Sequence, residues 1–388
     1  MRFSELTTQF PESTNRLYAR LGELKSGGVD HVDLIGSQVS DAGIVFPREI
    51  LDEILTEASG QAQTYRPDSL GQRVARNAIA AHYENRAVSP ERILLTPGTS
   101  IAYWYAFKLL CEPGENVLCP VPAYPLFDYI ARLAGVEISH YRLDEDRGWK
   151  IDLEHLEDQI TPQTRAIVLI SPHNPTGMVA DRDQIESLAG IAGRHQLPII
   201  SDEVFWNFTF GSDPVPRPLD TDVPLVFTLN GFSKMYALPG LKLGWMAVSG
   251  EDALVRKSMT TLELIADTFL PVNEIVQFSV PGIFDQGTAF LEGYKQRVLM
   301  CRNTMLEILG SVVPAPPLGG FYVVIPFDTD KCHAEEEDLA ITLLEKDHVL
   351  VHPGYFYDIE GQHLVFSFFH DANILKAVLP QIRKRLGV

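Results

Sequence analysis

The chain has 388 residues and a formal net charge of −19 at pH 7, with 45% hydrophobic and 21% charged residues. Its length predicts two domains rather than one small core, and its composition is that of an ordinary soluble globular protein. Because contact with nucleic-acid phosphates requires a basic face, the acidic balance argues against a nucleic-acid partner, although it leaves room for a local cationic pocket.

The sequence also argues against secretion and membrane insertion. The first ten residues, MRFSELTTQF, contain no apolar core of signal-peptide length. No run reaches the roughly 18 apolar residues that a membrane span needs. The cysteines, Cys111, Cys119, Cys301 and Cys332, show neither metal-ligand spacing nor the density of a disulfide scaffold. We therefore expect reduced, structural cysteines in a cytoplasmic protein.

The first 45 residues are irregular, and an arm of this kind has to pack against another element because it cannot bury itself. The sequence predicts a short helix around 13–24 and a strand over 32–35. A second helix is predicted over 47–60, where the apolar residues have helical spacing.

Strands alternate with helices through the middle of the chain. Apolar runs predict strands at 92–95, 116–118, 166–170, 197–200, 225–229 and 243–248, and helical spacing predicts helices at 101–110, 124–133, 181–194 and 251–269. This alternation indicates βαβ units and a mostly parallel sheet that is covered on both faces. Ligands bind such sheets at the carboxyl ends of the strands.

The last hundred residues follow a different pattern. A long helix is predicted at 289–309, and a Pro-rich break follows at 314–317. After the break, strands are predicted at 321–326 and 364–369, and each is followed by a helix, at 335–346 and 372–386. We therefore predict an α/β protein with an N-terminal arm at 1–45 that joins the smaller domain, a large domain at 46–285, and a small α+β domain at 286–388.

Lys234 lies in the segment NGFSKMYALPGLKLGW, soon after the apolar run at 225–229 and eight residues before Lys242. A lysine at the end of a buried strand is poorly placed as a solubilising charge. Burial and a neighbouring cation both favour the neutral amine, which can attack a carbonyl. Taken alone, Lys234 is better explained as one of 32 Lys and Arg residues on an ordinary surface, so its meaning depends on the other motifs.

Two of these motifs follow the strands predicted at 92–95 and 116–118. Gly98, Thr99 and Ser100 open a helix, whose free N–H groups and positive dipole end can hold a phosphate; a simple N-cap is the alternative. Tyr124, in the string PAYPLF, either stacks on a planar cofactor or belongs to the core.

Two more motifs follow later strands. Asn174, in SPHNPTG, can donate its amide hydrogens to a phenolate oxygen, although Asn-Pro is also common turn punctuation. Asp202 closes the run at 197–200, where a buried carboxylate is costly without a partner. A protonated ring nitrogen, a helix N-terminus or an arginine would each provide that partner.

In this order and spacing, the motifs resemble those of the class I/II aminotransferases of pyridoxal phosphate (PLP) fold type I, the aspartate aminotransferase superfamily. SPHNPTG and GFSK are the specific strings, and the resemblance extends from about Val32 to the C-terminus. It implies a large domain with a mostly parallel sheet and a smaller α+β domain. It also implies PLP, transfer of an amino group from an amino acid or its derivative to a 2-oxo acid, and a homodimer with shared active sites.

The resemblance further implies a role for each candidate residue. Lys234 would form the Schiff base with PLP and move the proton, Asp202 would pair with the pyridine nitrogen, and Asn174 would bind the 3′-oxygen. Tyr124 would stack on the ring. The implied phosphate-binding residues are Gly98, Thr99, Ser100, Ser233 and Lys242, with Tyr65 reaching the phosphate of the neighbouring subunit, and the implied substrate-pocket residues are Gly36, Asn174 and Tyr322.

Three positions depart from the family pattern. Phe205 replaces a tyrosine that binds the 3′-oxygen, which should raise the pKa of the Schiff base because the phenolate is less stabilised. Lys242 replaces an arginine and loses its two-pronged hold on the phosphate. Val365, or Phe366 if the register shifts by one, takes the place of the arginine that binds the substrate α-carboxylate.

The missing arginine predicts an unusual substrate: an amine, ester or amide without a free α-carboxylate, or an amino acid that another cation holds. The candidates for that cation are Lys331, Lys346, His352 and His370. A pocket enriched in aromatic residues, Phe205, Trp206, Tyr322 and Phe366, predicts a hydrophobic or aromatic side chain on the substrate.

Two alternatives stay open. A β-lyase, decarboxylase or cyclase can use the same fold, because PLP supplies the same carbanion and the pocket decides its fate. A non-catalytic PLP-binding sensor fused to a DNA-binding module is the other, and the acidic charge and the short segment before Val32 argue against it.

Overall fold

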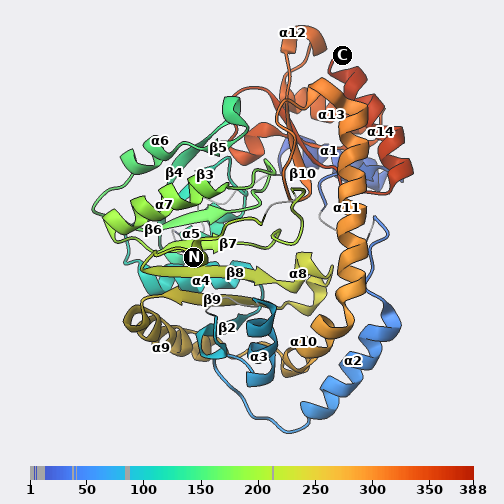
Figure 1. Ribbon diagram of the computed structural model, residues 1–388. Coiled ribbons are helices and arrows are strands. Elements are labelled where there is room, and N and C mark those ends of the chain that lie inside the picture. Colours follow the sequence, from blue (N-terminus) through green and yellow to red (C-terminus); the bar gives the residue numbers. More distant parts are fainter. Residues whose placement is uncertain are drawn as a thin grey trace.

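The computed structural model describes Ser4, Leu6 and residues 14–36, 39–40, 42–83, 88–211 and 214–388. An eight-stranded sheet lies at its centre, with helices on both faces (Figure 1). In their order across the sheet, the strands are β2 (Ile93–Thr96), β9 (Gly244–Gly250), β8 (Leu225–Gly231), β7 (Ile199–Asp202), β6 (Thr164–Ile170), β3 (Asn116–Val121), β4 (Glu137–Asp144) and β5 (Lys150–Ile151).

The carboxyl ends of most of these strands meet at one edge of the sheet. Strands β8, β7, β6, β3 and β4 are parallel neighbours. Strand β9 is antiparallel to both β8 and β2, so β2 points in the same direction as the parallel set. The segments that follow β2, β3, β6, β7 and β8 are therefore brought to the same edge, where sheets of this kind bind ligands.

Helices cover both faces of the sheet because its buried strands are apolar on both sides. These helices and the short ones beside them are α3 (Arg73–His82), α4 (Thr99–Leu110), α5 (Phe127–Ala134), α6 (Leu153–Asp158), α7 (Arg182–His195), α8 (Phe232–Met235), α9 (Asp252–Phe269) and α10 (Glu274–Gln286). In β6, Ala166, Val168 and Ile170 belong to the core formed with α4, α5 and α9. Ile167 and Leu169 belong to the core formed with α6 and α7 on the opposite face.

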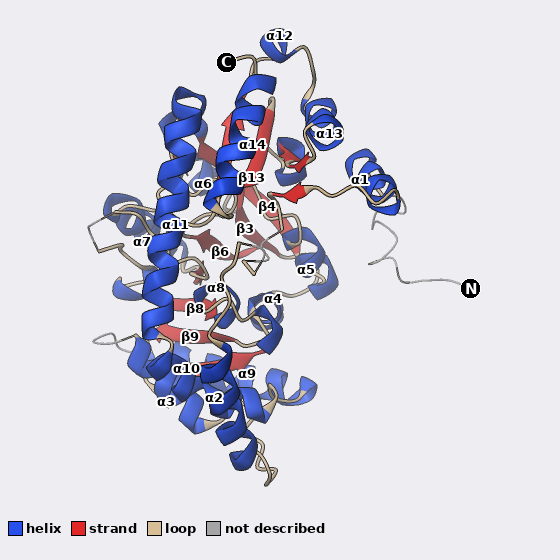
Figure 2. Cartoon of the chain, turned by 90° about the vertical axis from the view of Figure 1, so that its right-hand side faces the viewer, coloured by secondary structure: helices blue, strands red, loops and turns tan. Residues whose placement is uncertain are grey.

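The C-terminal part contains a small antiparallel sheet whose strands are ordered β10 (Tyr322–Pro326), β13 (His363–Ser367) and β12 (His352–Pro353). Its helices are α11 (Thr288–Leu309), α12 (Thr329–Cys332), α13 (Glu336–Lys346) and α14 (Ala372–Arg385). Helix α14 lies alongside the long helix α11 (Figure 2). Short 3₁₀ turns occur at Pro90–Arg92, Glu145–Arg147, Pro218–Asp220, Pro239–Leu241, Gly310–Val312 and Gly354–Tyr357.

The N-terminal segment packs against this C-terminal part. It comprises α1 (Arg16–Ser26) and β1 (Val32–Asp33), whereas α2 (Arg48–Gln61), further on, packs against α10 instead. Asn15 caps α1 by accepting a hydrogen bond from the backbone N–H of Tyr18 at 2.8 Å. Arg16 forms ion pairs with two carboxylates of α13 at 2.8 and 2.9 Å, and α1 lies beside that helix (Figure 2). Strand β1 pairs in parallel with β11 (Val349–Leu350).

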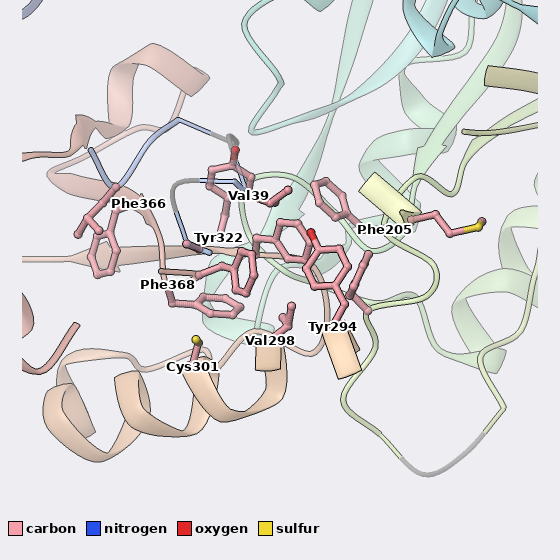
Figure 3. Close-up of a cluster of buried hydrophobic side chains, with 14 of the residues drawn as sticks. Val39, Phe205, Tyr294, Val298, Cys301, Tyr322, Phe366 and Phe368 are labelled. Carbon is pink, nitrogen blue, oxygen red and sulfur yellow. The ribbon is translucent and has the colours of Figure 1, made fainter. Parts of the chain in front are cut away.

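An aromatic cluster connects the edge of the large sheet to α11 and β10 (Figure 3). Phe205, shortly after β7, meets Phe321 edge-on with 5.0 Å between ring centroids. Tyr294 of α11 lies 4.7 Å from Phe208 by the same measure. Each such pair stabilises the fold by about 0.5–1.5 kcal/mol beyond the burial of its surface. The cluster therefore holds the backbone at Phe205 in a fixed position relative to the small sheet.

The structure confirms the mostly parallel sheet and adds elements that the sequence analysis missed. The buried residues of α3 include the charged Arg76, α10 contains Pro281, and β4 is largely polar and lies toward the sheet edge, which obscures their apolar patterns in the sequence. The helix expected to begin at Tyr124 begins at Phe127 instead. Across the described residues, no helix combines the length and apolar character required to cross a bilayer.

Candidate active site

A cavity of about 390 Å³ lies at the edge where the strand ends meet. Residues that end or follow five strands of the large sheet line it: Thr99 and Ser100, Tyr124, Asn174, Asp202, and Ser233 with Lys234. The N-terminal segment contributes Ile35, and the C-terminal part contributes Tyr322, His352 and Tyr357. Candidates that are far apart in the sequence thus converge on one cavity, as the strand-end pattern predicts.

Lys234 lies on the short helix α8, directly after β8, and is partly buried. Its Nζ atom is 5.6 Å from the centroid of the Phe205 ring. Burial lowers the pKa of this amine to about 8, because the charged form is poorly solvated there. Lys242, expected from the sequence to contribute to this shift as a neighbouring cation, is exposed, and burial is the cause of the lowered pKa. Lys234 can therefore lose its proton near neutral pH and act as a nucleophile.

Asp202 is the last residue of β7 and is only 8% exposed. The hydroxyl of Tyr103 donates to its Oδ2 atom at 2.8 Å, and the backbone N–H of Val204 donates to Oδ1 at 3.0 Å. Burial raises the pKa of Asp202 to about 6 against the opposing effect of these two hydrogen bonds. Among the described residues it forms no ion pair, so a cation within the cavity would relieve the cost of its buried charge.

A neighbouring carboxylate is already paired. Glu203 contacts Arg217, and both side chains are almost fully buried. The guanidinium also lies 4.5 Å from the Trp206 ring centroid and 4.9 Å from that of Tyr83. This pairing leaves Asp202, rather than Glu203, available to a ligand in the cavity.

Tyr103 was missed by the sequence analysis. It lies in α4, whose sequence TSIAYWYAFKLL is so uniformly apolar that one hydroxyl does not attract attention. Its ring packs edge-on against Phe127 with 4.6 Å between centroids, which directs the hydroxyl group toward Asp202. Only the three-dimensional contact shows its relation to the site.

Asn174 follows β6 in a loop that its own side chains hold in place. His173 Nδ1 and the Thr176 hydroxyl lie 2.9 Å apart, and the Ser171 hydroxyl accepts a hydrogen bond from the N–H of Ala180 at 3.1 Å. The Oδ1 atom of Asn174 is buried without a hydrogen-bond partner among the described residues. Rotating the amide by 180° would present N–H groups at the same place. Because Asn174 lines the cavity, its unpartnered amide oxygen is available to a ligand there.

The start of α4 forms a backbone turn suited to an anion. Gly98 caps the helix with φ 99°, and a Cβ atom there would meet nothing within 4 Å. A Cβ atom on Gly244 of β9 would lie 3.0 Å from the carbonyl carbon of Gly98, so glycine allows the two backbones to approach. The first N–H groups of a helix have no partner within it. Together with the hydroxyls of Thr99 and Ser100, they can hold a phosphate.

Five of the predicted site residues do not line the cavity of the single chain. Gly98 precedes Thr99, which does line it, and Gly36 is exposed next to Ile35. Lys242 is exposed with φ 52°, and Tyr65 is 71% exposed at the surface. Val365 is buried in the core instead of facing the cavity. Exposure of Tyr65 in one chain is what a role in a neighbouring subunit's site would require.

The register of the small sheet shows which of Val365 and Phe366 shares a face with residues that line the cavity. Val365 pairs with Val324 on one side and with His352 on the other. Side chains of paired residues lie on the same face of a sheet. Val365, rather than Phe366, therefore shares the face of His352 and of Tyr322, which both line the cavity.

His352 is the single member of the four candidate cations that lines the cavity. Its Nε2 atom lies 2.8 Å from the Tyr18 hydroxyl, and its Nδ1 atom lies 3.0 Å from the Tyr357 hydroxyl. Burial lowers its pKa to about 4, so the imidazole is neutral at physiological pH. Among the described residues that line the cavity, Lys234 is thus the one cationic side chain. The other three candidates, Lys331, Lys346 and His370, do not line it.

These groups fit one kind of cofactor. A nucleophilic lysine suits an aldehyde, a buried carboxylate without a cation suits a ring nitrogen that carries a proton, and the unpartnered amide suits a ring oxygen. The open backbone turn at Gly98 suits a phosphate, and the residues stand in one cavity. The α/β fold and this site define a PLP-dependent enzyme of fold type I.

Comparison with known proteins identifies the family. The chain belongs to the class I and II aminotransferases, whose family model matches residues 37–378. It is 30% identical to the glutamate-pyruvate aminotransferase AlaA of Escherichia coli over 325 residues, which cover 80% of this chain and 79% of the relative. It is 27% identical to the tyrosine aminotransferase of Dictyostelium discoideum over 307 residues, which cover 76% and 74% of the two chains.

Solved structures agree with this assignment. An aminotransferase from Escherichia coli superposes with a TM-score of 0.87 at 25% identity and covers 100% of this chain and 98% of its own. A double mutant of the aspartate aminotransferase from Thermus thermophilus gives the same TM-score and identity over the full length of both chains. The protein is therefore a PLP-dependent aminotransferase, and a lyase or decarboxylase activity is not favoured.

Proposed function

We propose that this aminotransferase accepts amino donors whose α-carbon carries an uncharged group in place of a free carboxylate. As an aminotransferase, it moves an amino group from an amino compound to a 2-oxo acid. The observation that carries the proposal is the apolar core position of Val365, together with a neutral His352 beside it. A carboxylate entering this end of the cavity would lose its hydration without gaining a cationic partner among the described residues.

We propose the following roles for the described residues. When bound, PLP supplies an electrophilic carbon and an electron sink. Lys234 would bind the cofactor and hold or release a proton at its Nζ atom, while Asp202 would keep the ring nitrogen protonated. Asn174 would donate to the ring oxygen, and Tyr124 would cover a face of the ring. The phosphate would be held by the α4 N-terminus with Thr99, Ser100 and Ser233.

We also propose a homodimer in which Tyr65 completes the partner's site. In the single chain, Tyr65 is 71% exposed near other exposed apolar side chains, including Leu270 at 68%. Large exposed apolar groups of this kind mark interaction surfaces. Sedimentation velocity should give twice the monomer mass, and Tyr65→Phe should weaken PLP retention. A monomeric wild type, or a Tyr65→Phe variant that retains PLP as well as the wild type does, would contradict this proposal.

A second candidate function is transamination of ordinary amino acids, which the names of the relatives favour: tyrosine and glutamate-pyruvate aminotransferases. In that case a group outside the described lining of the cavity would have to bind the carboxylate. The two candidates differ in the donor that reacts fastest, so a direct comparison of donors separates them.

The test is the visible absorption band of the holoenzyme before and after addition of a donor. Phenylalanine, phenylalaninamide and 2-phenylethylamine share one side chain and differ only in the α-substituent. We expect the amide and the amine to remove the band faster than phenylalanine, and faster than aspartate or glutamate. Fastest loss with a free amino acid would refute the proposed substrate class and leave the aminotransferase assignment intact.

A further inference from the structure

Three polar side chains form a hydrogen-bonded chain at the end of the cavity that the small sheet contributes. Tyr18 comes from α1, His352 from β12 and Tyr357 from the turn that follows β12. The imidazole lies between the two hydroxyls, at 2.8 Å from Tyr18 and 3.0 Å from Tyr357. His352 and Tyr357 line the cavity, so this chain is in reach of a bound substrate.

The neutral state of His352 determines which hydrogen bonds these three side chains can form with a ligand. A neutral imidazole has one N–H donor and one acceptor nitrogen. One tyrosine hydroxyl therefore donates to the ring, and the other accepts from it. The accepting tyrosine keeps its own O–H for another acceptor, and the donating tyrosine keeps its lone pairs for another donor. The three side chains can thus bind a ligand that has both a hydrogen-bond donor and a hydrogen-bond acceptor.

The electrostatic surroundings disfavour an anion at this place. Burial raises the pKa of Tyr18, and the carboxylate of Asp33 raises it further. The same carboxylate acts on His352, where it opposes the lowering of the pKa by burial. Asp33 is held close to the cavity wall, since it accepts a hydrogen bond from the N–H of Ile35 at 2.8 Å. A substrate carboxylate here would meet negative charge.

We propose that Tyr357, supported by His352 and Tyr18, is the specificity-determining group for a carboxamide on the α-carbon of the amino donor. A primary amide has an acceptor oxygen and donor N–H groups but no charge, which matches the hydrogen-bonding groups of Tyr18, His352 and Tyr357. This inference rests on the proposed function, because it specifies which uncharged group the cavity selects. Tyr322, whose hydroxyl lies 3.4 Å from the carbonyl oxygen of Ile35, borders the same space.

Binding of two unreactive compounds to the holoenzyme tests the proposal without any turnover. 3-Phenylpropanamide and 3-phenylpropanoate have the same shape and lack the amino group of the donor. They differ only in that the first carries a carboxamide and the second a carboxylate. Calorimetry with the wild type should give tighter binding of the amide. Tyr357→Phe should weaken amide binding about three- to tenfold, as expected for one lost hydrogen bond, and should change acid binding little.

Two further variants keep the result interpretable. Tyr18→Phe breaks the chain at its partly exposed end, and it should weaken amide binding in the same direction even if Tyr357→Phe does not fold. Tyr355→Phe is the matched control, because Tyr355 is exposed and donates to Glu337 outside the cavity. Its amide affinity should equal that of the wild type.

The outcomes separate the two proposals. Amide binding that exceeds acid binding and falls in both Tyr357→Phe and Tyr18→Phe supports the inference. The same preference with no loss in either variant overturns the inference and leaves the proposed substrate class standing. Tighter binding of 3-phenylpropanoate by the wild type overturns both.

Discussion

Replacement of Tyr103 by phenylalanine should raise the pKa of Asp202. The substitution removes the hydroxyl that donates to Oδ2 at 2.8 Å and keeps the ring that packs against Phe127. A hydrogen bond to a charged group contributes about 1.5–3 kcal/mol, and one pKa unit corresponds to about 1.4 kcal/mol. The pKa of Asp202, about 6 in the wild type, should therefore rise by about one to two units.

The same change has a defined effect on stability. The folded pKa of about 6 exceeds the ordinary value of 3.8, so the folded cofactor-free protein binds this proton more tightly than the unfolded chain does. The stabilising effect of that proton is fully present below about pH 4 and is lost as the pH rises through 6. In Tyr103→Phe the loss should continue toward pH 7–8, which urea unfolding at a series of pH values would show.

The assay is a ¹³C NMR titration of the cofactor-free protein with labelled aspartate carboxyl groups. Asp202→Asn identifies the signal of Asp202. Tyr105→Phe is the control, because Tyr105 is also buried in α4 but has no hydrogen bond to Asp202. An unchanged pKa in Tyr103→Phe, or an equal shift in Tyr105→Phe, would refute the reasoning.

The remaining predictions concern the cofactor site and its support. Lys234→Ala should abolish the yellow absorption band and turnover. In the cofactor-free wild type, the reaction of the Lys234 amine with a small aldehyde should increase with pH and be half-maximal near pH 8 rather than 10.5. A half-maximal rate near pH 10.5 would contradict the effect of burial on this pKa. Gly244→Ala should weaken PLP binding in a fluorescence titration because its Cβ atom would press on Gly98. Gly240→Ala is the control, since a Cβ atom there meets nothing within 4 Å and should leave PLP binding unchanged. Equal affinities of the two variants for PLP would contradict the steric argument. Glu203→Gln should lower the free energy of unfolding by about 3–5 kcal/mol in urea because its buried guanidinium partner loses a counter-charge, and a loss below 1 kcal/mol would show that the pair is dispensable.

Much of the site could be read from the sequence because its residues stand at the ends of apolar strands. Asp202, Asn174 and Lys234 each follow a buried run, and a parallel sheet brings such positions together without further information. The same logic gives the mostly parallel sheet itself. Local sequence therefore predicts the strands and the functional residues that directly follow them.

The hydroxyl partners could not be read in this way. Tyr103 contacts Asp202 across 99 positions of sequence, and Tyr18 contacts His352 across 334. Each lies in a helix where a tyrosine looks like any other apolar residue. His352 was considered as a cation, but its protonation state depends on burial, which a sequence alone does not show. Whether Val365 or Phe366 shares the sheet face of His352 and Tyr322 depended on strand register, which no local pattern specifies.

The pairing of β1 with β11 has a consequence for the order in which the protein takes shape during synthesis. Val32 and Val349 are neighbours in this pairing although 317 positions separate them. At about 5–20 residues per second, a ribosome needs roughly 15–60 s to make the intervening chain. During that interval the strands of the large sheet can already emerge and pair, while Leu17 and Leu34, buried in the finished protein, still lack their neighbours near the C-terminus. The end of the cavity that the small sheet contributes is thus the last to be assembled.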